Sequence, residues 1–134
     1  MRNVLWKNHR VEEEAARKAA AVTVGHGTFN LVGGLWPLIH RRSFEWVFGP
    51  KADRWLQFTV GGLLIASGIS QLAGADTPEG RAAARRLGLA VALTLLTIDL
   101  IYGPKGRIRP TYLLDAAAEA TWITTWLRTL RRRG

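Results

Sequence analysis

The stretch 111–127, TYLLDAAAEATWITTWL, decides how the rest of the chain is interpreted. It has the length and the flanking residues of a membrane-crossing helix, yet it contains two acidic residues, Asp115 and Glu119. Because these acids are four positions apart, they share one face of a helix. A carboxylate inside a bilayer is costly, so acids in such a stretch indicate a functional site that includes a partner.

Composition limits the class of protein. The chain has 134 residues, the size of one domain, and no cysteine, which excludes disulfides, thiolate metal ligands and cysteine nucleophiles. Its formal net charge of +9 is divided among short basic clusters that separate uncharged apolar stretches. A nucleic-acid-binding protein needs a continuous basic face, whereas this pattern is typical of the loops of a membrane protein. We therefore expect no nucleic-acid partner.

Three further stretches have the length of a membrane span, 19–40, 55–75 and 84–102. A helix of about 20 residues crosses the roughly 30 Å hydrocarbon core of a bilayer. Together with 111–127, these stretches predict an all-α integral membrane protein with four transmembrane helices in a bundle of two helical hairpins. The whole chain, 1–134, then forms a single membrane domain. The ranges outside the spans are an interfacial lead-in at 1–18 and a basic tail at 128–134.

The distribution of Lys and Arg predicts the orientation of this bundle. The lead-in, the middle loop and the tail together carry more of these residues than the two other loops, so the positive-inside rule places both termini in the cytoplasm. The predicted localisation is an inner (plasma) membrane, multi-pass, with anionic lipids as partners. A competing arrangement has three spans, with 111–127 lying on the membrane surface as an amphipathic helix.

Small residues predict where the helices pack. Two rows, each with a spacing of four residues, are Gly62, Ala66 and Ser70, and Ala84, Gly88 and Ala92. Rows of this kind allow two helix backbones to approach closely, so we expect the helices that carry them to pack tightly.

Two acids are expected at the same height near the outer surface. Asp99 lies about one turn inside the end of the third stretch, and Asp115 lies about one turn inside the start of the fourth. The connecting loop contains three basic residues that can reach back to them: Lys105, Arg107 and Arg109. Two interpretations stay open, an Asp–Arg network that fixes the hairpin and an outward-facing entry site for a cation or proton.

Glu119 lies deeper, near the middle of its stretch. Asn30 is near the middle of the first stretch, and His26 lies one turn away on the same face. If these two helices are neighbours, the three side chains form a buried polar ladder. Glu119 would then serve in one of three ways: as a hydrogen-bonding group that holds helices together, as a proton or cation relay, or as a contact for a partner subunit.

Cofactor and catalytic patterns are sparse. The three histidines are dispersed, so no metal site is expected. His26 and His40 fall on similar faces of one predicted helix, which leaves binding of a tetrapyrrole, a haem or a chlorophyll-type pigment, as an alternative. No Ser–His–Asp arrangement, phosphate-binding loop or dinucleotide fingerprint occurs, so we expect no enzymatic activity.

These observations lead to three functional hypotheses. The first is a non-enzymatic accessory or interaction subunit of a larger membrane assembly, acting as a homo-oligomer or with other membrane subunits. The second is a small oligomeric proton- or cation-coupled transporter or channel that uses Glu119. The third is tetrapyrrole binding through His26 or His40.

Overall fold

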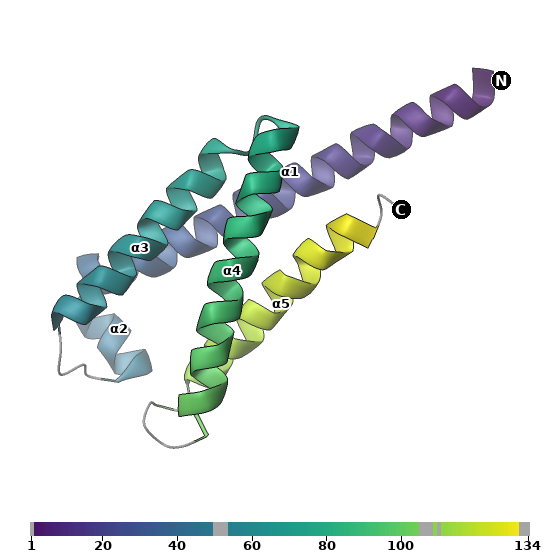
Figure 1. The fold of residues 1–134 in the computed structure, drawn as a ribbon. Helices are drawn as coiled ribbons and strands as arrows, with labels where there is room; N and C mark the ends of the chain where they lie inside the picture. The colour runs from purple at the N-terminus through teal and green to yellow at the C-terminus, as the bar shows by residue number, and fades with distance from the viewer. Residues whose placement is uncertain (1, 50–53, 105–108, 110, 132–134) are drawn as a thin grey trace.

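The computed structural model describes residues 2–49, 54–104, 109 and 111–131, and this part of the chain is helical (Figure 1). Its helices are α1 (Arg2–Ile39), α2 (Arg41–Phe48), α3 (Arg54–Ala73), α4 (Pro78–Tyr102) and α5 (Tyr112–Arg131). The all-α class predicted from the sequence is confirmed.

The predicted bundle of four transmembrane helices is wrong. Of the helices in the described part of the chain, α3 alone is long and apolar enough to cross a membrane. The same finding overturns the multi-pass inner-membrane localisation and the placement of both termini in the cytoplasm, because both were derived from four spans.

Charged turns explain the difference. Helix α1, which contains 19–39, begins at Arg2, so its first half is a charged and exposed segment. Helix α4 starts before 84–102 and carries arginines in its first turns, and α5 contains two acids within 111–127 and arginines beyond it. The apolar stretches are therefore parts of longer, more polar helices.

Helix α4 has a well-defined start and end. The hydroxyl oxygen of Thr77 accepts a 2.9 Å hydrogen bond from the backbone N–H of Gly80, and Pro78 occupies the first turn, where its missing N–H is not needed. At the other end, the N–H of Gly103 donates to the carbonyl oxygen of Asp99. The Thr77 cap defines where α4 begins after the short turn from α3, and the Gly103 cap defines where it ends.

Helix α2 lies where the sequence analysis expected a connection between spans. The Nδ1 atom of His40 accepts from the backbone N–H of Ser43, and the indole N–H of Trp36 donates to the Ser43 hydroxyl at 2.7 Å. The helix ends at Phe48 and is capped by Gly49, whose φ of 91° is in the left-handed region that favours glycine. Side-chain caps thus stabilise a helix too short to be recognised by its apolar pattern.

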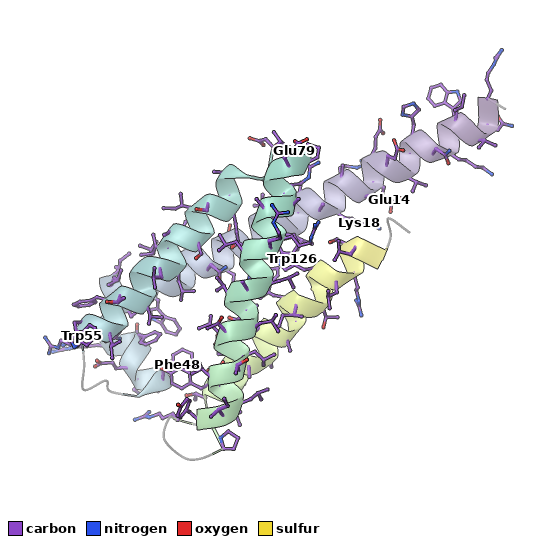
Figure 2. All side chains as sticks on the ribbon, in the orientation of Figure 1. Glu14, Lys18, Phe48, Trp55, Glu79 and Trp126 are labelled. Carbon is purple, nitrogen blue, oxygen red and sulfur yellow. The ribbon has the colours of Figure 1, made fainter. Side chains whose placement is uncertain are left out.

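The helices form two packed pairs. Helix α1 packs mainly on α3, and α4 packs mainly on α5. Helices α3 and α4 meet at their connecting turn and diverge toward their other ends, and the first part of α1 extends beyond the bundle (Figure 1). Glu14 and Lys18 form a 2.8 Å ion pair on this protruding part (Figure 2).

Two polar contacts join α2 to the chain just before α5. The guanidinium of Arg109 donates to the carbonyl oxygen of Trp46 at 3.1 Å, and the hydroxyl of Thr111 donates to the carbonyl oxygen of Val47 at 2.7 Å. Helix α2 therefore bridges the open end between the two pairs.

Glycines determine how closely α1 and α3 approach. A Cβ atom on Gly34 would collide with the carbonyl oxygen of Gly61, and a Cβ on Gly27 would lie 3.1 Å from the carbonyl oxygen of Gly68. The two backbones are thus in direct contact, and side chains at these positions would separate them.

The two predicted rows of small residues do not pack on each other. Ala84, Gly88 and Ala92 are buried, as expected for a packing face. The row Gly62, Ala66 and Ser70 is exposed instead, and a Cβ on Gly62 would meet no atom within 4 Å. This row is one face of α3, which we call the α3 ridge.

The interior is polar and the exterior is apolar. Among the described residues, the buried apolar ones are Ala19, Ala84, Ala92, Ala116 and Trp126. The buried polar ones are Thr23, His26, Asn30, Gln57, Gln71, Asp99 and Glu119. Many large apolar side chains are exposed, and Trp55 projects outward from the end of α3 (Figure 2).

Candidate functional site

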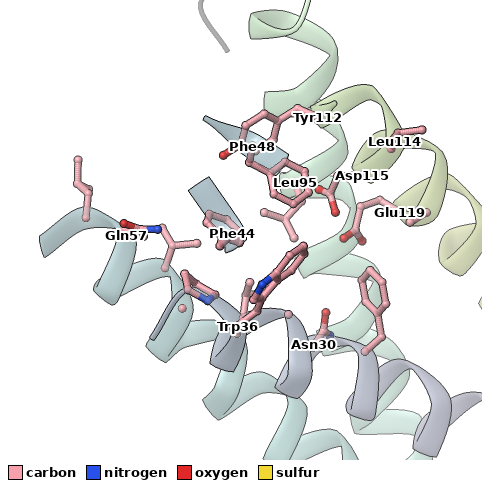
Figure 3. A pocket seen from close by; sticks show the side chains of 18 residues that line it. Asn30, Trp36, Phe44, Phe48, Gln57, Leu95, Tyr112, Leu114, Asp115 and Glu119 are labelled. Carbon is pink, nitrogen blue, oxygen red and sulfur yellow. The ribbon is translucent and has the colours of Figure 1, made fainter. Parts of the chain in front are cut away.

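A cavity of about 660 Å³ lies where the two helix pairs diverge, and all five helices line it (Figure 3). Its wall is mainly apolar. It includes five aromatic side chains, Phe29, Trp36, Phe44, Phe48 and Tyr112.

Aromatic contacts fix the wall next to α2. The rings of Trp36 and Phe44 meet edge to face, with centroids 5.4 Å apart, and the rings of Trp36 and Phe48 are 5.9 Å apart. Phe48 also contacts Tyr112 with centroids 4.8 Å apart. Such pairs stabilise a defined arrangement, so the cavity is bounded by packed rings from three helices.

Glu119 is the most deeply buried acid in the wall. Its exposed fraction is 0%, and among the described residues neither carboxyl oxygen has a hydrogen-bond partner. Burial raises the pKa of Glu119 to about 8, and the nearby charges of Asp115 and Asp99 act in the same direction. Without a bound cation, this carboxyl is therefore mostly protonated at neutral pH.

Asp99, near the end of α4, and Asp115, in the first turn of α5, lie together on either side of the α4–α5 connection. Burial raises the pKa of Asp99 to about 8, and a hydrogen bond with Asp115 and the charge of Asp115 contribute further. Burial and these two acids also raise the pKa of Tyr112 to about 12. With Glu119, these acids form a cluster that we call the carboxyl cluster.

The predicted basic partners do not reach this cluster in the part of the chain that the structure describes. Arg109 donates to a carbonyl of α2 and packs against Gly49 instead. Lys105 and Arg107 lie outside the described residues. The ion pairs within the described ranges, Lys18–Glu14 and Arg41–Glu45, are elsewhere.

The predicted ladder of His26, Asn30 and Glu119 does not form as one network. His26 and Asn30 are connected through Gln71, and Glu119 is separate from them. The amide of Asn30 donates to the side-chain oxygen of Gln71 at 2.7 Å, and the Gln71 amide lies 3.2 Å from Nδ1 of His26. The indole N–H of Trp126 also donates to this Nδ1 at 2.9 Å. Glu119 takes no part in this network.

His26 is held in its neutral form. Because Nδ1 accepts a hydrogen bond, the proton lies on Nε2, and burial lowers the pKa of His26 to about 4. The ring also stacks on Trp122, with centroids 4.8 Å apart. His26 therefore acts as a neutral acceptor that joins three helices.

Gln71 is the central residue that the sequence analysis did not identify. Its amide also donates to the carbonyl oxygen of Ala84 at 3.3 Å, so it connects α1 to α4. The sequence feature that could have identified it is the presence of two glutamines, Gln57 and Gln71, in an uncharged stretch. A buried amide needs partners, which makes such residues candidates for helix contacts.

Asn30 and Glu119 nevertheless face the same space. Figure 3 shows the carboxyls of Asp115 and Glu119 and the side chain of Asn30 directed into the cavity. The Oδ1 atom of Asn30 has no hydrogen-bond partner within the described ranges. The cavity wall thus presents several oxygen atoms that have no hydrogen-bond partner among the described residues.

The histidines and acids of the described chain do not form a metal site. Within the described residues, no group of three His, Asp or Glu side chains could hold a metal ion. His26 is fully buried and His40 is an exposed cap of α2, and neither lines the cavity. Tetrapyrrole binding through these histidines stays a prediction.

Comparisons with protein-family models, curated proteins and solved structures find no match.

Proposed function

We propose that the protein is a non-enzymatic interaction subunit that associates with a second copy of itself through the exposed face of α3. The observation that carries this proposal is the inverted distribution of apolar residues. Four alanines and one tryptophan are the buried apolar residues of the described chain, whereas large apolar side chains are exposed on α3, α4 and α5. Large apolar side chains exposed in such number on one helix indicate an interaction site.

The α3 ridge is the part of this surface best suited to another helix. Its small residues are flanked by large exposed ones, including Leu63 at 64% and Ile69 at 53% exposure. A helix packed there would approach the backbone closely at the ridge and bury the flanking side chains. Complete burial of one Leu or Ile side chain contributes about 1.5–3 kcal/mol.

The absence of charged residues from 55–73 of α3 supports a second copy of the chain as the partner that covers the α3 ridge. The protein carries a net charge of +9, which opposes association in general, but no Lys, Arg, Asp or Glu occurs from Trp55 to Ala73. Two copies can therefore bring their α3 faces together without placing like charges in contact. A two-fold pair would use the same face on both subunits.

Light scattering coupled to size-exclusion chromatography tests the proposal. The wild type is expected to have at least twice the monomer mass at micromolar concentration, and Ala66→Glu is expected to restore the monomer, because the interface would bury an unpaired charge. Ala83→Glu, at an exposed position on α4, is the matched control and should leave the mass unchanged. A monomeric wild type, or equal masses for the two variants, would contradict the proposal.

A further inference from the structure

The cavity lies on a different side of α3 from the proposed interface. Its α3 lining consists of Leu56, Gln57, Val60, Gly61 and Leu64, none of which belongs to the α3 ridge. Association through the ridge therefore does not account for the cavity or for the acids in its wall.

The size and lining of the cavity suit an organic molecule. Pockets for small molecules measure about 300–1,000 Å³ and combine an apolar wall with a few polar groups. This cavity, at about 660 Å³, has aromatic rings on one side and Glu119 on the other. A ligand that fits it has an apolar body and one polar end.

The unsatisfied groups determine the chemistry of that polar end. Glu119 is completely buried and both its carboxyl oxygens lack partners among the described residues, as does Oδ1 of Asn30. Leaving buried acceptors unpaired is costly, and an ionised carboxylate needs a compensating positive charge. When Glu119 is ionised, its two oxygens and Oδ1 of Asn30 all accept hydrogen bonds, so a ligand at this end of the cavity must donate them. Gln57 of α3, whose amide nitrogen and oxygen also lack partners among the described residues, lines the cavity as well.

The described wall supplies no such positive charge. The cavity lining contains no Lys or Arg, and Arg109, which precedes α5, is bonded to the carbonyl of Trp46. A metal ion fits poorly, because the wall is mainly apolar and the described residues contain no set of metal ligands. The remaining class is an organic cation with N–H donors.

We propose that the cavity binds a protonated amine with an apolar body. The ammonium group lies against Glu119 and donates to its carboxylate and to Oδ1 of Asn30. The apolar body contacts the rings of Trp36, Phe44 and Phe48, whose faces also attract a cation. Asp115, on the same wall, adds negative potential at the ammonium end.

The ionisable groups around the site make binding depend on pH. Glu119 and Asp99 have pKa values raised to about 8, so both lose their protons as pH rises from 6.5 to 9. Two further titratable side chains line the cavity, Asp115 and Tyr112, both on α5. Tyr112, with a pKa of about 12, stays neutral in this range, as does the nearby His26 of α1, with a pKa of about 4. No ionisable side chain of α2 or α3 lines the cavity.

Three probes of matched shape test the proposal by isothermal titration calorimetry at pH 9: 1-adamantylamine, 1-adamantanol and 1-adamantanecarboxylate. The wild type is expected to bind the amine at least tenfold more tightly than the alcohol or the carboxylate. Glu119→Gln should reduce amine affinity at least tenfold and leave alcohol affinity unchanged. Glu79→Gln, an exposed acid at the start of α4, is the control and should bind like the wild type.

Circular dichroism establishes whether Glu119→Gln is folded. If it is not, the wild-type affinity for the amine between pH 6.5 and pH 9 decides the question: a tenfold or greater increase supports the site, and a flat profile overturns it. The proposal is also overturned if the amine does not bind, if the alcohol binds equally well, or if folded Glu119→Gln retains wild-type affinity. The α3 interface is independent of each of these results.

Discussion

The Nδ1 atom of His26 accepts a 2.9 Å hydrogen bond from the indole N–H of Trp126, and both side chains are almost completely inaccessible to solvent. This bond joins α1 to α5, helices that are far apart in the chain. Gly88 of α4 makes room for it, because a Cβ there would lie 2.8 Å from His26 Nδ1 and 2.9 Å from the indole nitrogen. Three helices thus meet at one polar contact.

Replacing Trp126 by phenylalanine is expected to lower the free energy of unfolding by about 1–3 kcal/mol, because it removes a buried hydrogen bond and leaves space in the interior. Urea denaturation followed by circular dichroism measures this change. Trp46→Phe, at a side chain that is 80% exposed, should change stability by less than about 0.5 kcal/mol. Equal effects of the two substitutions would show that the His26–Trp126 contact is not formed.

Two adjacent glycines of α1 should respond oppositely to alanine. A Cβ on Gly33 meets no atom within 4 Å, so Gly33→Ala should stabilise the helix by up to about 1 kcal/mol. A Cβ on Gly34 meets the backbone of Gly61 and the N–H of Ile65, so Gly34→Ala should destabilise the protein by about 1–3 kcal/mol. Thermal unfolding of both variants checks this, and the same sign for both would refute the α1–α3 packing.

Stability should fall as pH rises above 6.5. The pKa of Glu119 is raised from 4.5 to about 8 in the folded state, so between these values the folded protein keeps a proton that the unfolded chain has released. The free energy of unfolding therefore decreases with pH, by at most about 1.4 kcal/mol per pH unit for each such acid. His26, whose pKa is lowered from 6.5 to about 4, has the opposite effect, but only below pH 6.5.

Urea denaturation at several values between pH 6.5 and pH 8 measures this slope. Glu119→Gln cannot titrate, so its slope should be shallower than that of the wild type, with Asp99 responsible for the remainder. Identical slopes for the two proteins would mean that the Glu119 carboxyl is not buried as the structure places it.

The helical class could be predicted because long uncharged stretches favour helices, and each of the four predicted stretches overlaps a long helix. The identification of 19–40, 84–102 and 111–127 as membrane spans was wrong because apolar length was judged without the charged residues of the same helices. The stretch 55–75 differs, since α3 is long and apolar enough to cross a membrane. Helix α2 could not be found from periodicity, since it depends on the cap formed by His40 and Ser43.

Part of the candidate site could also be anticipated. Counting turns placed Asp99 and Asp115 at the same level, and in the structure they share a hydrogen bond. The bond from Arg109 to the carbonyl of Trp46 and the central role of Gln71 could not be deduced, because they depend on which helices are neighbours. Close contacts between glycines of α1 and α3 determine that these two helices are neighbours. The spacing of glycines within each helix does not reveal which helix will pack on which.

The most direct test of the α3 interface uses the absence of cysteine from the chain. Single cysteines at Gly62, Ala66 and Ser70 would face their counterparts in a second copy, and a disulfide forms when two Cα atoms approach to within about 7 Å. Under mild oxidation, we predict a covalent dimer on a non-reducing gel for at least one of these variants, formed much faster than for Asn8→Cys on the protruding part of α1. If none of the three cross-links faster than Asn8→Cys, the α3 ridge is not an interface between copies.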